Sequence, residues 1–148
     1  MYQFVIDKNY SKKDIYKIIG IPENTRGGNW DTGYNFHKDD LFIFANIGVP
    51  GRTGHQYNNK LNGEYFHWYA KNRTKLNQHQ IQKILNPTGY VYIFYRSDNA
   101  KPFKFMGTGT PYAYKDVSPV QITWQVNTEF DNNQISKSEN DIRGIKLL

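Results

Sequence analysis

Apolar residues recur along this chain in five stretches of strand length. Residues 41–48 are apolar at nearly every position, which is typical of a strand buried on both faces. In residues 64–70 the pattern alternates, so that Glu64, Phe66, Trp68 and Ala70 share one face while Tyr65, His67 and Tyr69 share the other. Three further strands are predicted over residues 90–96, 103–109 and 119–126.

Two short segments show helical spacing instead. Residues 11–19 place Ile15, Ile18 and Ile19 on one face, with Ser11 and Asp14 forming a capping box and Gly20 ending the helix. Residues 77–85 repeat this spacing, with Asn77 as the predicted amino-terminal cap. The pattern as a whole predicts an α+β, mainly β fold, a mixed, barrel-like sheet with two short helices.

Three loops separate these elements. Residues 21–34 are rich in glycine and contain Arg26, Asn29 and Trp30. For Trp30 we favour a place in the core over stacking on a base, whereas Arg26 and Asn29 are candidates for contact with a partner. Residues 49–60, with Pro50 and two glycines, and residues 71–75 are predicted to project from the strands that precede them.

The length of 148 residues and the composition narrow the class of protein. We expect one domain over residues 1–127, followed by a polar linker or the start of a following domain over residues 128–148. The chain has no cysteine, which excludes disulfides and thiolate nucleophiles. It shows no membrane-length apolar run and no signal peptide, so we expect no membrane partner and a cytoplasmic location.

The positive charge is concentrated in the middle of the chain. The formal net charge is +6, and residues 52–104 hold nine of the 19 Lys and Arg but only two of the 13 Asp and Glu. That segment therefore carries +7, and the rest of the chain carries −1. Such an asymmetry favours a surface that binds a polyanion, although a basic protein kept soluble by its charge is the simpler alternative.

Residues 51–80 combine this charge with hydrogen-bonding side chains. Five cations face a single acid there, and amide and imidazole side chains lie between them. Cations suit DNA phosphates, and amide and imidazole groups suit base edges. The alternative is a polar, solvated hairpin.

An enzyme without a partner domain is not favoured. Phosphodiester cleavage usually requires a metal held by carboxylates, or a nucleophile with a base, but the acids are scattered. His55, His67 and His79 recur every 12 residues, without the spacing of a metal site. We therefore expect no catalytic residues, no metal and no cofactor.

Several motifs carry a resemblance. The chain resembles the domain appended to bacterial restriction helicases and nucleases. The likeness rests on these stretches, in this order: RGGNWDTGY, LFIFANIG followed by GRTGHQY, FHWYAKNRTKLNQ and YIFYRSDNAKPFKFMGTG. The same order is similar to the B3-like effector domain of EcoRII-type restriction endonucleases. The likeness covers roughly residues 10–125. One departure is Ala70, where the relatives usually have glycine after the Trp-aromatic pair.

The resemblance implies a B3-like pseudobarrel that clamps the major groove of double-stranded DNA between two arms. It implies a bacterial protein that partners a nuclease domain in the same or another chain. The first arm carries Arg52, Thr53, Gly54, His55, Gln56, Tyr57, Asn58, Asn59 and Lys60. The second arm carries His67, Tyr69, Lys71, Asn72, Arg73, Thr74, Lys75, Asn77 and Gln78.

Within these arms the chemistry of each side chain suggests its role. Arg52 and Arg73 are predicted to bind guanine edges, because a planar guanidinium matches O6 and N7 together. Adenine is assigned to Gln56, Asn58 or Asn72, and phosphates to Lys60, Lys71 and Lys75. Both arms are expected to leave adjacent strands and so to straddle one groove.

Three other functions are open. A methylated-cytosine reader would flip the base into a pocket lined by Trp30, Trp68 and Tyr69. A small stand-alone nuclease would cleave DNA with a metal. A carbohydrate-binding module is the most remote of these three functions, since a basic surface gives neutral sugars no advantage.

Overall fold

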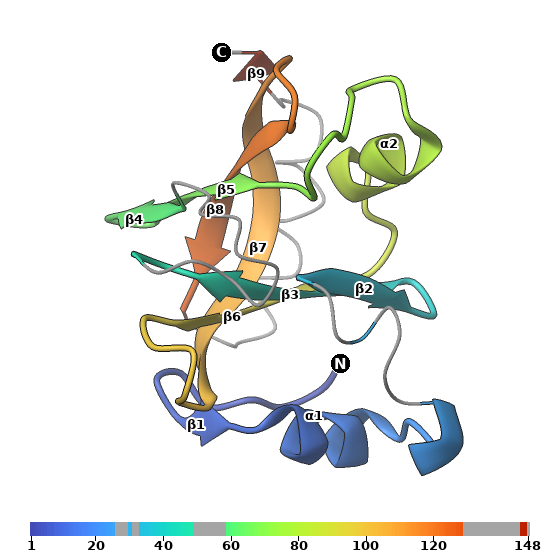
Figure 1. Ribbon diagram of the computed structural model, residues 1–148, viewed down its shortest axis with the longest axis vertical. Helices are drawn as coiled ribbons and strands as arrows, with labels where there is room; N and C mark the ends of the chain where they lie inside the picture. The colour runs from blue at the N-terminus through green and yellow to red at the C-terminus, as the bar shows by residue number, and fades with distance from the viewer. Residues whose placement is uncertain (26–29, 31–32, 49–58, 129–145, 148) are drawn as a thin grey trace.

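The computed structural model describes residues 1–25, 30, 33–48, 59–128 and 146–147. This part of the chain holds nine strands, two α-helices and one 3₁₀ helix (Figure 1). In chain order they are β1 (Asn9–Tyr10), α1 (Lys12–Ile19), η1 (Glu23–Thr25), β2 (Tyr34–His37), β3 (Asp40–Asn46), β4 (Lys60–Asn62), β5 (Tyr65–Tyr69), α2 (His79–Leu85), β6 (Val91–Arg96), β7 (Phe103–Lys115), β8 (Gln121–Asn127) and β9 (Lys146–Leu147).

All nine strands belong to one mixed sheet. Its order is β2-β3-β6-β7-β8-β5-β4, and β1 and β9 both pair with β7. The neighbours β3 and β6 are parallel, as are β7 and β9, whereas the other pairs are antiparallel. The predicted mainly β, mixed sheet with two short helices is therefore confirmed.

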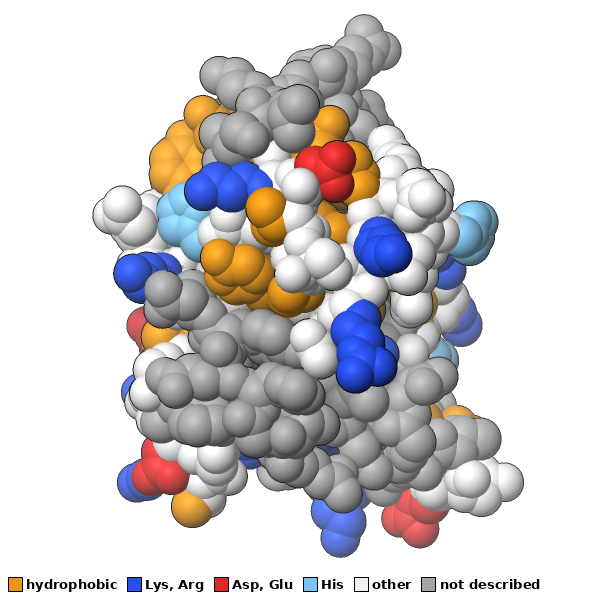
Figure 2. Space-filling view, turned by 45° about the horizontal axis from the view of Figure 1, so that its top comes forward, with side chains coloured by type: hydrophobic (Ala, Val, Ile, Leu, Met, Phe, Trp, Pro, Cys, Tyr) orange, Lys and Arg blue, Asp and Glu red, His pale blue; other side chains and the backbone are white. Residues whose placement is uncertain are grey.

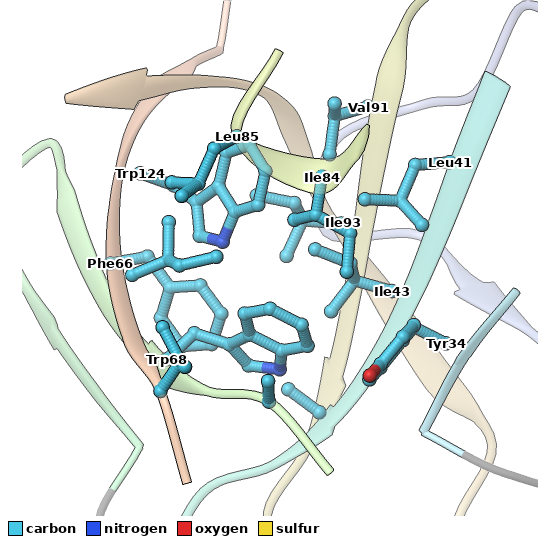
Figure 3. Close-up of a cluster of buried hydrophobic side chains, with 14 of the residues drawn as sticks. Tyr34, Leu41, Ile43, Phe66, Trp68, Ile84, Leu85, Val91, Ile93 and Trp124 are labelled. Carbon is cyan, nitrogen blue, oxygen red and sulfur yellow. The ribbon is translucent and has the colours of Figure 1, made fainter. Parts of the chain in front are cut away.

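The sheet curls until its two ends approach each other. Tyr34 on β2 and Trp68 on β5 stand near opposite ends of the strand order, yet their rings meet edge to face with centroids 5.2 Å apart. Inside the curl, Phe66 and Trp124 of β5 and β8 point across the first core toward Ile43 and Ile93 of β3 and β6 (Figure 3). Ile84 and Leu85 of α2 cover the open side of this core. This curvature gives the open sheet its barrel-like shape.

A second core lies on the other side of β3, β6 and β7. It is mostly aromatic and includes Phe42 and Phe44 of β3, while Ile15, Tyr16 and Ile19 of α1 cover it. Since Leu41, Ile43 and Ala45 belong to the first core, β3 is buried on both faces, as its apolar run predicted. Trp30 belongs to this second core and is 7% exposed, so its predicted core role is confirmed.

The capping signals of α1 are present as predicted, whereas Ile18, which was predicted to share the core face with Ile15 and Ile19, is exposed. The Ser11 hydroxyl accepts from the Asp14 backbone N–H at 3.1 Å, and the Asp14 carboxylate accepts from the Ser11 backbone N–H at 3.0 Å. Hydrogen bonds from Ser11 to the Asp14 carboxylate, first of all from the backbone N–H, hold the pKa of Asp14 below its ordinary value. Gly20 ends the helix in the left-handed conformation, with φ 78°.

The predicted cap of α2 was wrong by one residue. Gln78, not Asn77, occupies the cap position, and its side chain makes no capping hydrogen bond to the helix. The Gln78 side chain instead accepts from the backbone N–H of Lys75 at 3.2 Å, which leaves it turned toward the preceding loop.

Candidate nucleic-acid interface

Most of the first predicted arm lies outside the described residues. Arg52, Thr53, Gly54, His55, Gln56, Tyr57 and Asn58 are in this group, together with Arg26 and Asn29 of the glycine-rich loop. The structure does describe the roots of the first arm, which are the end of β3 before it and Asn59 and β4 after it.

Asn59 joins the roots of both arms. Its Nδ2 donates to the backbone carbonyl of Asn46, the last residue of β3, at 3.1 Å. Its Oδ1 accepts from the backbone N–H of Tyr69, the last residue of β5, at 3.0 Å. The loop of the first arm lies between Asn46 and Asn59 in the sequence, and the turn of the second arm begins at Lys71, after its two residues on β5. One amide side chain thus fixes the start of the second arm next to both ends of the first.

These bonds change two of the sequence-based expectations. The strands that carry the arms, β3 and β5, are not neighbours in the sheet, because β6, β7 and β8 lie between them. They come together because the sheet curls. Asn59 itself is 7% exposed and uses both ends of its amide within the fold, so we assign it a structural role rather than a base contact.

The second arm is a compact turn held against the body of the protein. The Thr74 hydroxyl accepts from the backbone N–H of Val120 at 3.1 Å, and the Thr74 carbonyl accepts from the Ser118 hydroxyl at 2.9 Å. The Thr74 backbone N–H donates to the Lys71 carbonyl at 3.2 Å, which closes the turn. Thr74 is therefore an anchor of this arm, and the anchoring reduces the entropy cost of ordering the turn around a ligand.

Arg73 stands at the exposed tip of this turn. Its backbone has φ 66°, the left-handed region that residues other than glycine rarely adopt. The other exposed side chains of the arm are Asn72, Lys75, Asn77 and Gln78. The turn therefore directs cations and amides outward while Thr74 and the half-buried Leu76 face the protein.

Lys71 occupies a less exposed place. Its Nζ lies 4.4 Å from the centre of the Tyr34 ring, so the ammonium group rests against an aromatic face. Partial burial lowers the pKa of Lys71 below its ordinary value. Lys71 thus brings a poorly hydrated positive charge to the place where β2 meets the start of the second arm.

The predicted contacts on β5 form part of the outer face of the sheet. His67 lies between Lys60 of β4 and Thr123 of β8, and its Nδ1 is 3.0 Å from the Thr123 hydroxyl oxygen. His67 and Tyr69 are half-buried, and Lys60 is exposed. The geometry places Lys60 and His67 together on this face, but the Lys71–Gln78 turn belongs to the far end of β5.

The aromatic residues considered for base flipping are mostly unavailable. Trp30 packs edge to face on Tyr16 with centroids 5.5 Å apart, and Trp68 is 3% exposed inside the first core. Tyr69 is half-buried, so part of its side chain is exposed, unlike those of Trp30 and Trp68.

On the face shown in Figure 2, the described Lys and Arg side chains are separated from one another by hydrophobic and uncharged ones. Among the residues the structure describes, no group of three or more His, Asp or Glu side chains is placed to hold a metal ion. In the same part of the chain, no helix has the length and hydrophobicity needed to cross a membrane.

Sequence reasoning missed Arg96, the last residue of β6. Its Nε donates to the Asn46 side-chain oxygen at 2.9 Å, and its guanidinium carbon lies 4.3 Å from the centre of the Phe103 ring. The strand pattern of residues 90–96 placed Arg96 at a strand end, but only the parallel pairing of β3 with β6 brings it beside Asn46.

The comparisons with known proteins point to one family and one fold. A family model described as "Domain of unknown function (DUF3427)" matches residues 4–137. The solved "Structure of the Type IV phosphorothioation-dependent restriction endonuclease ScoMcrA" is similar with a TM-score of 0.52 and 9% identity, over 98% of this chain. This chain spans 31% of that protein, and at such low identity the likeness shows the fold alone. No curated protein matches the sequence.

Proposed function

We propose that this chain, which belongs to the DUF3427 family, is a double-stranded DNA-recognition domain of a restriction system. It reads sequence by clamping the major groove between residues 52–60 and 71–78, as a B3-like effector domain does. It carries no catalytic residues, and a nuclease domain in the same or another chain performs the cleavage.

The observation that carries this proposal is the double hydrogen bond of Asn59. It ties Asn46 at the root of one basic segment to Tyr69 beside the root of the other. Two arms that are fixed at a common base can approach one duplex from two sides. Because the base is part of the folded body, little ordering is required there on binding.

The chemistry of the second arm supports a division of labour. Arg73 at the tip has the planar fork that matches the O6 and N7 of guanine. Asn72 is exposed beside it and suits adenine. Lys71 and Lys75 flank this pair and suit phosphates, which position the domain without reading sequence.

The likeness to ScoMcrA supports a restriction-related role. That protein is described as a phosphorothioation-dependent restriction endonuclease, and this chain matches a part of it. A dependence on modified DNA is therefore a second function to test. For a methylated base flipped out of the duplex, the buried positions of Trp30 and Trp68 leave only Tyr69 among the three aromatic candidates.

The test is selection from a randomised duplex pool at two salt concentrations. Parallel pools carry unmodified DNA, cytosine-methylated DNA and DNA with phosphorothioate linkages. We expect a short motif to be enriched from the unmodified pool and to survive the higher salt concentration, because base contacts resist salt better than phosphate contacts do.

The other outcomes each assign a different function. Enrichment confined to a modified pool would mean that the domain reads the modification. Uniform binding that disappears with salt would mean a phosphate-binding surface without sequence readout. Cleavage of the pool by the purified chain with a divalent metal would contradict the non-catalytic assignment.

A further inference from the structure

The guanidinium group of Arg96 is held in one orientation by two neighbours. Its Nε–H donates to the Asn46 Oδ1 at 2.9 Å, and its guanidinium carbon lies over the Phe103 ring, 4.3 Å from the ring centre. Phe103 is itself buried in the second core. An Arg side chain normally loses much rotamer freedom when it binds a ligand, and here that freedom is already restricted.

The end of the guanidinium that recognises anions remains available. The bond through Nε leaves the N–H groups of both Nη nitrogens without a partner among the described residues. Burial lowers the pKa of Arg96, and the negative charge of Asp98 acts in the opposite direction. The Asp98 carboxylate accepts from the Ala100 backbone N–H at 2.9 Å and so caps its own turn.

Arg96 belongs to the same hydrogen-bonded network as the roots of the arms. Its partner Asn46 uses the side-chain oxygen for Arg96 and the backbone carbonyl for Asn59, which in turn binds Tyr69. The Arg96 carbonyl also accepts from the Ile47 backbone N–H at 2.9 Å, which continues the β3–β6 pairing to the root of the first arm.

We infer that Arg96 binds a backbone phosphate of the duplex, at the base of the first arm. The inference rests on the proposed function and adds a contact outside both arms. Arg96 is half-buried on the body of the protein, whereas Arg73 in the second arm is exposed, so Arg96 meets the DNA backbone rather than a base edge. Two Nη donors in one plane match two oxygens of a phosphate.

The test compares the equilibrium affinity of the full chain and its variants for a fixed duplex, and for a duplex of scrambled sequence, across a range of salt. Arg96→Gln is the informative variant, because glutamine can still reach Asn46 and cover Phe103 but carries no charge. Lys101→Ala is the matched control, because it removes an exposed cation from the turn that follows β6. Unfolding of each variant confirms that it is folded.

We expect Arg96→Gln to weaken binding to both duplexes alike, by roughly tenfold or more. The slope of log affinity against log salt should fall by about 0.9, the value for one lost phosphate contact. Arg96→Lys should restore the slope but not the full affinity, because the planar fork is lost. Lys101→Ala should change the affinity much less.

Two results would overturn the inference in distinguishable ways. If the wild-type chain binds duplex DNA while Arg96→Gln, folded, keeps the wild-type affinity and slope, then Arg96 makes no phosphate contact and the proposed function stands. If the wild-type chain binds neither duplex nor any sequence from the randomised pool, the proposed function fails, and this inference fails with it.

Discussion

Replacing Asn59 with alanine should destabilise the protein strongly although the side chain is small and polar. The change removes both bonds that Asn59 makes across the curled sheet, to the Asn46 carbonyl and to the Tyr69 N–H. A buried backbone group left without a partner costs about 1–3 kcal/mol, so the two together cost about 2–6 kcal/mol. Since Asn46 and Tyr69 are half-buried, water can replace part of the loss, and we expect the lower end of this range.

The free energy of unfolding in urea measures this loss directly. Asn62→Ala is the control, because Asn62 is an exposed amide on the edge strand β4 that follows Asn59, and the change should alter stability by less than about 0.5 kcal/mol. Asn59→Asp provides a second variant, since it keeps an acceptor for the Tyr69 N–H but turns a carboxylate oxygen toward the Asn46 carbonyl. If Asn59→Ala were as stable as Asn62→Ala, Asn59 would not hold the arm roots together.

Three further predictions concern the second arm and α1. The Arg73→Gly variant should have a free energy of unfolding about 0.5–1 kcal/mol higher than that of Arg73→Ala, because φ 66° strains any side chain. Equal free energies of unfolding would contradict this strain. In binding assays, both variants should lose discrimination at one base position. Lys71→Met should be more stable than wild type at neutral pH, because burial lowers the Lys71 pKa and the charged form therefore costs stability below that pKa. Unfolding measured at increasing pH should show this difference shrinking toward pH 10.5, the ordinary pKa, and a constant difference would refute the cause. Ser11→Ala should cost about 1 kcal/mol in thermal or urea unfolding through loss of the cap, against a negligible change for the exposed Ser97→Ala.

The elements with strong periodic patterns could be predicted from the sequence. The alternation of Phe66 with Trp68 and of Ile122 with Trp124 identified the two strands whose inner faces fill the first core. The capping box of Ser11 located the start of α1. In each case the signal is local, because it depends on residues within one turn or one strand.

The elements that depend on distant partners could not be predicted in this way. The sequence after Gly107 suggested a strand ending near residue 109, but β7 continues to Lys115 through a register shift between Pro111 and Ala113. Gly107 allows β7 to pass close to the end of β8, since its φ is 144° and an added Cβ would meet the Asn127 carbonyl. The short strands β1, β2 and β4 form because longer strands offer them hydrogen-bonding edges, which a local pattern does not reveal.

The sequence could suggest candidate site residues, but it could not reveal the roles that Asn59 and Thr74 have in the fold. Asn59 and Thr74 have the same side-chain chemistry as the neighbouring residues that we propose to read bases, and only their hydrogen bonds within the fold show that they are anchors. Conversely, Arg96 looked like an ordinary strand end. The role of a polar side chain depends on which backbone groups lie near it, and this information comes from the closure of the sheet.

Amide hydrogen exchange with and without a duplex enriched from the randomised pool tests the central claim most directly. If the two basic segments clamp one duplex, residues 52–60 and 71–78 should both gain protection when the enriched duplex is added, and should gain less with a scrambled duplex at the same concentration. Protection of only one segment, or protection confined to a different face of the protein, would contradict the two-armed clamp.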